Sequence, residues 1–324
     1  MQHTQILVIG GSGFIGRHIV ARLIARGLRV TVPTRRRSRA RHLILLPTID
    51  VVECDVHNDA DLDALMRDRD AVINLVGVLH GSYGPRGSPY GPEFAKAHVE
   101  LPRRIVAACH KHKVARLLHM SALGADSSGP SMYQRSKGDG DELVHKSELN
   151  WTILRPSVVF GPEDNFLNLF AKLAKFLPVL PIACAGARFQ PVWVGDVADA
   201  FANALDNRAA FQNTYELAGP KIYALLDLAR FAADASGHPR PVIAVPPSIA
   251  RIQAFLMELA PGEPLMSRDN LDSMKADNIA SQQPFRPASE LRIEMTPMEP
   301  EAAAYLSSEH NRNRFSIYRA RAGR

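Results

Sequence analysis

The first half of the chain alternates short apolar runs with amphipathic segments. Residues 6–9 form a continuous apolar run that ends at two glycines, as in a central parallel strand buried on both faces. Strands that alternate with helices predict an α/β fold with a doubly wound parallel sheet. The predicted strands cover 6–9, 29–33, 49–53, 71–76, 115–121 and 151–154, and the predicted helices cover 14–26, 59–67, 93–113 (with a bend at Pro102) and 132–147.

The regular alternation weakens after Arg155, where proline, glycine and aromatic residues become frequent. We therefore predict a first domain over 1–160, a smaller C-terminal lobe over 161–308 with elements that return to the first domain, and a basic tail over 309–324. A largely apolar helix is predicted over 248–260. Its Phe255, Leu256 and Leu259 either pack onto the main lobe, which we favour, or form an edge that faces lipid or a partner.

Composition and charge narrow the function classes. The 324 residues are 46% hydrophobic and 22% charged, which excludes a disordered or collagen-like chain. The net charge of +6 suits phosphate-bearing ligands, an acidic partner or an anionic membrane surface. Three scattered cysteines make neither a disulfide framework nor a cysteine-based zinc site, and we predict no metal site.

The ends and the apolar stretches bear on localisation. The strand pattern begins near Gln5, which leaves no room for a secretory signal. The longest apolar stretch, over 176–187, contains two prolines and is shorter than the ~20 residues that a spanning helix needs. We therefore expect no transmembrane segment and a cytoplasmic protein, with a peripheral position on the cytoplasmic face of the inner membrane as a variant of that expectation.

A glycine pattern follows the first strand and opens the first helix. Its glycines fall at Gly10, Gly13 and Gly16. A pyrophosphate needs a tight turn, close backbone approach and the positive end of a helix dipole, and this context supplies all three. The segment predicts a Rossmann-like dinucleotide site whose phosphate-binding residues are Gly10, Ser12, Gly13, Phe14, Ile15 and Gly16. The alternative is a strand–helix turn without a ligand.

The end of the second predicted strand indicates which dinucleotide binds. A carboxylate about 20 residues beyond the glycines would hold the ribose 2′-hydroxyl of NAD(H). Here the strand is followed by Arg35 and Arg36, with no acid in reach. A guanidinium grips a 2′-phosphate through two hydrogen bonds, so we predict NADP(H) in preference to NAD(H). The alternative is a solvated basic loop; a nucleic-acid surface is disfavoured because no aromatic residues are interleaved.

Two further strand ends fit the same site, because ligands of open α/β sheets lie at the carboxyl ends of the strands. Asp55 and Val56 follow the third strand, where Asp55 is placed to accept from the adenine amino group or else to cap a turn. Leu75, Val76 and Gly77 follow the fourth strand and are predicted to border the adenine ribose.

Candidate chemistry lies on the helix after the fifth strand. Tyr133 and Lys137 are four residues apart and share a helix face. An ammonium group beside a phenol stabilises tyrosinate and lowers its pKa from ~10, which makes the pair a proton donor or acceptor for a carbonyl/alcohol couple. Ser121 ends the preceding strand, where its hydroxyl is placed to bond the substrate oxygen.

These motifs resemble the atypical and extended short-chain dehydrogenases/reductases. The resemblance rests on the glycine pattern, Asp55-Val56, Ser121, Tyr133-x-x-x-Lys137 and Arg155-Pro156-Ser157-Val158, and it covers most of residues 5–220. Segments 97–102, 118–123, 190–198 and 268–278 look like the bacterial relatives of the nucleotide-binding accessory subunit of respiratory complex I. That narrower resemblance implies tightly held NADPH, with Lys137 and the backbone of Pro156, Ser157 and Val158 at the nicotinamide side.

Three function hypotheses follow from the resemblance. The first is an NADP(H)-binding accessory or assembly-type protein whose partner is complex I or another membrane-peripheral assembly. The second is an active reductase, epimerase or dehydratase on a small carbonyl, alcohol or nucleotide-sugar substrate, with Tyr133 as acid/base. The third is a regulatory module that reports NADPH by binding alone. His98 stands where extended members have asparagine, and Gly138 and Gly140 are expected to loosen the helix that carries Lys137.

Overall fold

The computed structural model describes residues 3–307, with gaps at 86, 260–261, 263 and 282–287. The basic tail predicted over 309–324 lies outside the described residues. The predicted α/β class is confirmed by a seven-stranded parallel sheet of order β11-β6-β5-β4-β1-β2-β3. Its strands are β1 (Gln5–Ile9), β2 (Arg29–Thr34), β3 (Ile49–Glu53), β4 (Ala71–Asn74), β5 (Arg116–Met120), β6 (Asn150–Pro156) and β11 (Asn213–Leu217).

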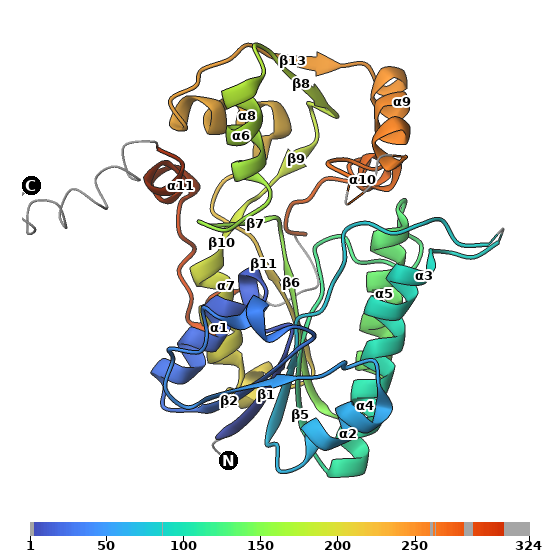
Figure 1. The fold of residues 1–324 in the computed structure, drawn as a ribbon, viewed down its shortest axis with the longest axis vertical. Coiled ribbons are helices and arrows are strands. Elements are labelled where there is room, and N and C mark those ends of the chain that lie inside the picture. The colour runs from blue at the N-terminus through green and yellow to red at the C-terminus, as the bar shows by residue number, and fades with distance from the viewer. Residues whose placement is uncertain (1–2, 86, 260–261, 263, 282–287, 308–324) are drawn as a thin grey trace, which may run out of the picture.

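Helices cover both faces of this sheet (Figure 1). On one face, α1 and α7 pack against each other over a core that contains Ile6, Val8 and Leu118. On the other face, α2, α4 and α5 pack over a core that contains Leu7 and Ile9 of β1, Leu117 of β5 and Ile153 of β6. The bounds are α1 (Phe14–Ala25), α2 (Asp59–Met66), α4 (Leu101–His112), α5 (Met132–His145) and α7 (Val194–Ala204).

The single helix predicted over 93–113 is instead built from three pieces. A short α3 (Pro92–Phe94) leads into a π-helical turn, η2 (Ala95–Glu100), before α4 begins. Pro102 has no N–H and cannot donate to the carbonyl of His98, so the regular ladder is interrupted at this point. The sequence predicted a bend at Pro102 but not the π-helical turn that precedes it.

The upper part of Figure 1, which we call the small lobe, contains α6, β8, α8, β13, α9 and α10. Its own core includes Leu167, Phe170, Leu180 and Leu228. The bounds are α6 (Leu167–Phe176), β8 (Leu180–Ala183), α8 (Leu225–Ala235), β13 (Val242–Val245), α9 (Pro247–Glu258) and α10 (Arg268–Ser273). Short strand pairs and α11 complete the fold: β7 (Val159–Phe160) with β10 (Val192–Trp193), β9 (Arg188–Phe189) with β12 (Tyr223–Ala224), and α11 (Met298–Leu306).

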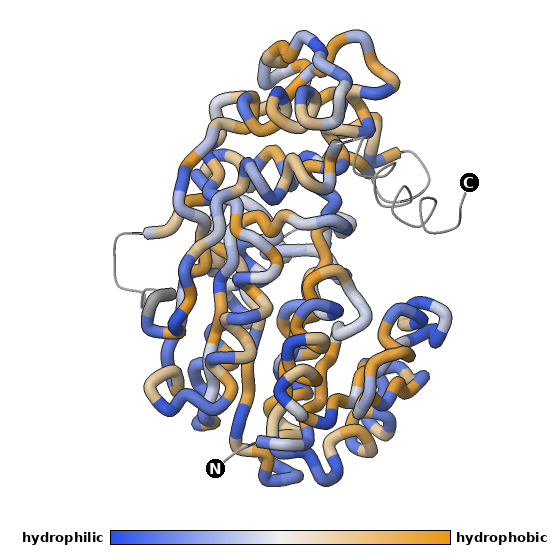
Figure 2. Tube along the Cα trace, turned by 90° about the vertical axis from the view of Figure 1, so that its left-hand side faces the viewer, coloured by the Kyte–Doolittle hydropathy of each residue, from blue (hydrophilic) through white to orange (hydrophobic). Residues whose placement is uncertain are grey.

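Hydrophobic segments run through the middle of both parts of the molecule, and hydrophilic segments gather at the turns at the opposite end from the small lobe (Figure 2). Within the described ranges, no helix is long and apolar enough to cross a membrane.

Candidate dinucleotide site

The glycine turn joins β1 to α1 with tight backbone packing. Gly10 has φ +87°, a left-handed conformation that favours glycine, and its carbonyl accepts from Gly13 N at 3.1 Å. A Cβ on Gly16 would lie 2.4 Å from the Gly10 oxygen, so only glycine lets α1 approach the turn. Gly13 is the N-cap of α1 and no described side chain caps that helix. The amides of Phe14 and Ile15 therefore remain available for an anion.

The other residues of the turn have packing contacts. Ser12 is half-buried within it, and Ile15 packs against the core of the sheet. The Phe14 ring lies within 3.2 Å of the position that a Cβ on Gly161 would take. Gly10 also touches the end of β4, because a Cβ there would lie 3.1 Å from the Leu75 carbonyl carbon. The turn thus lies between β1 and β4, where the strand order reverses and doubly wound folds bind their ligands.

Two arginines follow β2 at the same edge. Arg35 and Arg36 are exposed, and no ion pair within the described ranges engages either guanidinium group. The nearest strand-end carboxylate is Glu53, which accepts from the backbone N–H of Arg37 at 2.9 Å. Arg35 is close enough to His57 to contribute to a lowered imidazole pKa there, although burial is the larger cause. The edge therefore presents two uncommitted cations for an anion.

The residues predicted to border the adenine side lie at the same carboxyl-end edge of the sheet as Arg35 and Arg36. Asp55 is exposed, and its carboxylate accepts from His57 N at 3.1 Å, which is the turn-capping alternative. Val56 packs partly into the core beneath α2 and α4. Leu75 N donates to the Ile9 carbonyl, and the Val76 N–H is held by the Asn74 side chain.

Gly77 connects this edge to the catalytic candidates. A Cβ on Gly77 would lie 3.3 Å from Lys137 Nζ and 3.6 Å from His98 Nε2. Lys137 is only 3% exposed, and its ammonium donates to the Met120 carbonyl at 3.1 Å. Burial lowers the pKa of Lys137 to about 8, while the charge of Asp141 opposes that shift. Gly77 and Lys137 are thus brought together at the ends of β4 and β5.

Tyr133 shares the face of α5 with Lys137, but its pKa differs from the expectation. Burial, assisted by the charge of Asp141, raises the pKa of the Tyr133 phenol instead of lowering it. Its ring stands edge-on to His98, with centroids 5.6 Å apart, and packs against Phe94. Burial and the charge of Asp141 therefore outweigh any stabilisation of tyrosinate by Lys137 in this structure.

Ser121 also departs from its expected role. Its hydroxyl is buried and donates to Asp141 Oδ2 at 2.8 Å. Arg155 donates to the same oxygen through Nε at 2.9 Å and Nη2 at 2.8 Å. Burial raises the pKa of Asp141, and Arg155 opposes the shift. In this structure the hydroxyl is therefore committed to the buried Asp141–Arg155 ion pair.

Two residues that were not predicted from the sequence, Asp141 and His119, lie beneath the Tyr133–Lys137 face. Asp141 continues the spacing of four from Tyr133 and Lys137, a signal that identifies it as a third residue on that face. His119 accepts from the Asn74 amide at Nδ1, which places its proton on Nε2, 3.7 Å from Asp141 Oδ1. A buried polar layer therefore supports the site from below.

His98 is held as a neutral imidazole. Its Nε2 accepts from the Val78 N–H at 3.1 Å, so its proton is on Nδ1, which donates to Ser136 Oγ at 2.8 Å. The Ser136 hydroxyl in turn donates to the Tyr133 carbonyl. His98 thus joins the loop after β4 to α5, rather than providing a proton path of its own.

The glycines of α5 have a packing role that replaces the expected looseness. A Cβ on Gly138 would lie 2.3 Å from Ser127 N, and one on Gly140 would lie 2.2 Å from the His98 carbonyl oxygen. Neither position has room for a side chain because backbone fills it. The glycines let α5 press against the loop after β5 and against η2, which fixes the height of Lys137.

A distant segment, residues 267–278, contacts both sides of the site. The Asp269 carboxylate accepts from the Met132 and Tyr133 backbone N–H groups at the start of α5. Asn278 Oδ1 accepts from Ser157 Oγ at 2.6 Å and from Val158 N at 3.0 Å. Pro156 ends β6, and its carbonyl accepts from Leu123 N. The predicted nicotinamide-side residues are therefore tied to the small lobe.

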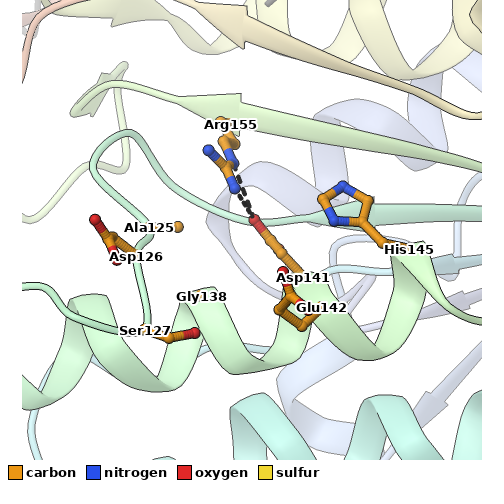
Figure 3. A pocket seen from close by; sticks show the side chains of 8 residues that line it. All are labelled: Ala125, Asp126, Ser127, Gly138, Asp141, Glu142, His145 and Arg155. Carbon is orange, nitrogen blue, oxygen red and sulfur yellow. Dashed lines mark hydrogen bonds and ion pairs between the residues drawn. The ribbon is translucent and has the colours of Figure 1, made fainter.

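A pocket of about 260 Å³ lies beside the buried ion pair and not beside Tyr133 (Figure 3). In Figure 3 dashed lines join the Arg155 and Asp141 side chains, which lie between Asp126 on one side and His145 on the other. The lining residues are Ala125, Asp126, Ser127, Gly138, Asp141, Glu142, His145 and Arg155. The described residues contain no cluster of three or more histidine, cysteine or acidic side chains suited to a metal.

The comparisons with known proteins identify the family. The model of the NAD dependent epimerase/dehydratase family matches residues 6–218. The chain belongs to that family. It is 31% identical over 288 residues to an Arabidopsis thaliana protein, the mitochondrial NADH dehydrogenase (ubiquinone) 1 alpha subcomplex subunit 9, with 85% of this chain and 70% of that protein covered. It is 30% identical over 280 residues to the 40 kDa subunit of NADH-ubiquinone oxidoreductase from Neurospora crassa, with 86% and 72% covered.

Solved structures of other epimerase/dehydratase folds superpose on this chain. The dTDP-glucose 4,6-dehydratase of Streptomyces venezuelae, solved with NAD bound, has a TM-score of 0.73 at 18% identity and covers 97% of this chain and 98% of its own. At that identity the likeness shows the fold alone. The predicted resemblance to this superfamily, and within it to complex I subunits, is confirmed.

The buried histidines give a pH prediction. Burial lowers the pKa of His119 to about 3 and that of His98 well below its usual value. In the unfolded chain both bind protons below about pH 6.5, whereas the folded chain does not, so stability falls as the pH drops from about 6.5. Each contributes a slope that approaches about 1.4 kcal/mol per pH unit.

Urea unfolding at about pH 7 and about pH 5 measures this slope. We expect His98→Asn to have a shallower slope than the wild type, because the contribution of His98 is removed. His110→Asn, at an exposed position of α4, is the matched control and is expected to keep the wild-type slope. An unchanged slope in His98→Asn would contradict the neutral buried state of His98.

Proposed function

We propose that this chain is an NADP(H)-binding accessory or assembly-type subunit of a respiratory NADH dehydrogenase, in which the cofactor is largely structural or sensory. The curated relatives are named as subunits of that enzyme. The observation that carries the proposal is the state of the catalytic candidates: the Ser121 hydroxyl donates to Asp141, and the pKa of Tyr133 is raised. This arrangement favours holding a dinucleotide over proton transfer at neutral pH.

The residues at the strand ends fit a dinucleotide. The uncapped amides of Phe14 and Ile15 would receive the pyrophosphate. Asp55, Val56, Leu75, Val76 and Gly77 would border the adenosine half, and Lys137 with the backbone of Pro156, Ser157 and Val158 would border the nicotinamide half. Bound NADPH would supply hydride only if a substrate reached that end. A peripheral position at the cytoplasmic face of the inner membrane agrees with this role.

Cofactor choice is tested at Arg35. We expect Arg35→Ala to weaken the affinity for NADPH by about 10- to 100-fold, because a charge-assisted contact to the 2′-phosphate is lost. The affinity for NADH is expected to change by less than about threefold, because NADH has no 2′-phosphate. Titration calorimetry with both dinucleotides measures this. The matched control is Arg39→Ala, an exposed arginine in the loop beyond, which is expected to leave both affinities unchanged. Equal losses for the two dinucleotides would assign the specificity elsewhere.

A second candidate function is an active reductase or epimerase. It is favoured by the shared face of Tyr133 and Lys137 on α5, next to Gly77. The two functions separate in one experiment, in which the purified NADPH form meets a panel of small carbonyl substrates and the absorbance of the cofactor is followed. Turnover that Tyr133→Phe abolishes would establish the enzyme. We expect no turnover and co-purification with membrane-bound dehydrogenase subunits.

A further inference from the structure

Helix α9 buries small side chains and exposes large ones. Ala250 and Ala254 face the lobe, where they pack with Ala183 and Leu271. Its large aliphatic side chains point outward: Ile249, Ile252 and Leu256 are each more than half exposed, and Leu259, just beyond the helix, is 68% exposed. Folding of the chain alone does not explain this arrangement, since a surface helix ordinarily turns its large apolar side chains to the core. The favoured expectation that Phe255, Leu256 and Leu259 pack onto the main lobe is wrong, because these side chains are 43%, 60% and 68% exposed.

Neighbouring elements add apolar surface at the same end of the molecule. The pair β8–β13 lies at the end of the small lobe away from the seven-stranded sheet, with α6 and α8 on one side of it and α9 on the other (Figure 1), and hydrophobic segments reach the outer turns of the lobe (Figure 2). Phe176, at the end of α6, is 78% exposed, and Ile243 in β13 is 51% exposed. We name as the apolar tip the side chains of Phe176, Ile243, Ile249, Ile252, Leu256 and Leu259.

The charges around the apolar tip are mostly positive. Segments 170–185 and 238–259 contain four basic residues, Lys172, Lys175, Arg240 and Arg251, and one acidic residue, Glu258. Glu258 is paired with Arg268 at 2.8 Å, and Arg251 is paired with Asp272 of α10 at 3.2 Å, so the positive charge left at the tip comes from α6 and Arg240. Among the described residues, Lys172 and Lys175 have no ion-pair partner, and both are exposed. The tip therefore combines aliphatic side chains with uncompensated cations.

The chemistry of the tip favours lipid over protein as its occupant. Protein interfaces concentrate tyrosine, tryptophan and arginine and form about one hydrogen bond per 100–200 Å². The tip offers isoleucine, leucine and phenylalanine, with almost no hydrogen-bonding groups. Apolar side chains flanked by lysine and arginine match the acyl chains and headgroups of an anionic leaflet. We infer that the small lobe docks onto an anionic lipid bilayer through the apolar tip.

The test uses the purified full chain and protein-free vesicles in a flotation assay. We expect binding to vesicles of phosphatidylcholine with phosphatidylglycerol, weaker binding to phosphatidylcholine alone, and a decrease with added salt. The double variant I252Q/L256Q is expected to bind at least about tenfold more weakly, because two exposed aliphatic side chains that would enter the bilayer are lost. K172Q/K175Q is expected to lose the preference for the anionic vesicles.

Leu45→Gln is the matched control, because Leu45 is 91% exposed and lies outside the small lobe; it is expected to bind like the wild type. Circular dichroism and dinucleotide retention of each variant show that the fold and the proposed NADP(H) site are intact, so a failure here is separate from a failure of the proposed function. Absent binding to anionic vesicles, or equal binding by I252Q/L256Q, overturns the inference. A dimer that I252Q/L256Q dissociates, without vesicle binding, also overturns it and assigns the tip to a second copy.

Discussion

Replacing Arg116 with methionine is expected to lower the free energy of unfolding by about 3–5 kcal/mol. Arg116 is fully buried at the start of β5, and its guanidinium donates to the carbonyls of Ala204, Leu205 and Asn150. The first two carbonyls end α7, so the cation also meets the negative end of that helix. Methionine keeps much of the volume but leaves the two buried carbonyls of Ala204 and Leu205 unpaired, together with the partly buried carbonyl of Asn150.

Urea unfolding monitored by circular dichroism measures the Arg116 effect. Arg22→Met is the matched control. Arg22, in α1, also contacts α7, where it pairs with Asp199, but its side chain is half exposed. An exposed ion pair contributes little, so this control is expected to change stability by less than about 1 kcal/mol. If Arg116→Met were as mild as the control, the guanidinium would not be the group that caps α7.

The second large effect is expected at Gly140. Alanine is the better helix former by about 1 kcal/mol, so propensity alone predicts that Gly140→Ala stabilises α5. The added Cβ would lie 2.2 Å from the His98 carbonyl oxygen, which belongs to backbone that cannot move aside. We expect a net loss of about 2–4 kcal/mol and weaker dinucleotide retention, because α5 carries Lys137 away from Gly77.

Gly186→Ala provides the control for Gly140→Ala. No atom lies within 4 Å of the position that its Cβ would take. The free energy of unfolding of Gly186→Ala, measured in urea, is expected to stay within about 0.5 kcal/mol of the wild-type value. A stabilised Gly140→Ala variant would show that η2 and α5 are not in close contact.

The features predicted correctly from the sequence are those encoded by neighbouring residues. The parallel strands show as apolar runs, and the glycine turn shows as a strand, three spaced glycines and a helix. The bounds of β3 agree residue for residue with the prediction over 49–53. The predictions that rest on contacts distant in the chain were weaker. Asp269 binds the start of α5, 137 residues away in the sequence, and Asn278 binds Ser157, 121 residues away. No pattern among neighbouring residues predicts either contact.

The roles of side chains were harder to predict than their positions. Tyr133 and Lys137 share a helix face as expected, but a sequence does not show how deeply a phenol is buried, and burial determines the direction of its pKa. Ser121 lies at the end of β5 as expected, yet its hydroxyl is turned to Asp141. Gly138 and Gly140 were interpreted by helix propensity, whereas their neighbours in space decide their effect.

The double attachment of residues 267–278 bears on how fast a ligand can exchange. Asp269 binds one end of the segment to α5, and Asn278 binds the other end to the residues that follow β6. On the side that residues 267–278 cover, α5 and the residues after β6 cannot separate unless the hydrogen bonds of Asp269 or those of Asn278 break. If the proposed dinucleotide lies between α5 and the residues after β6, its release requires that these hydrogen bonds break, and we expect it to survive purification and dilution.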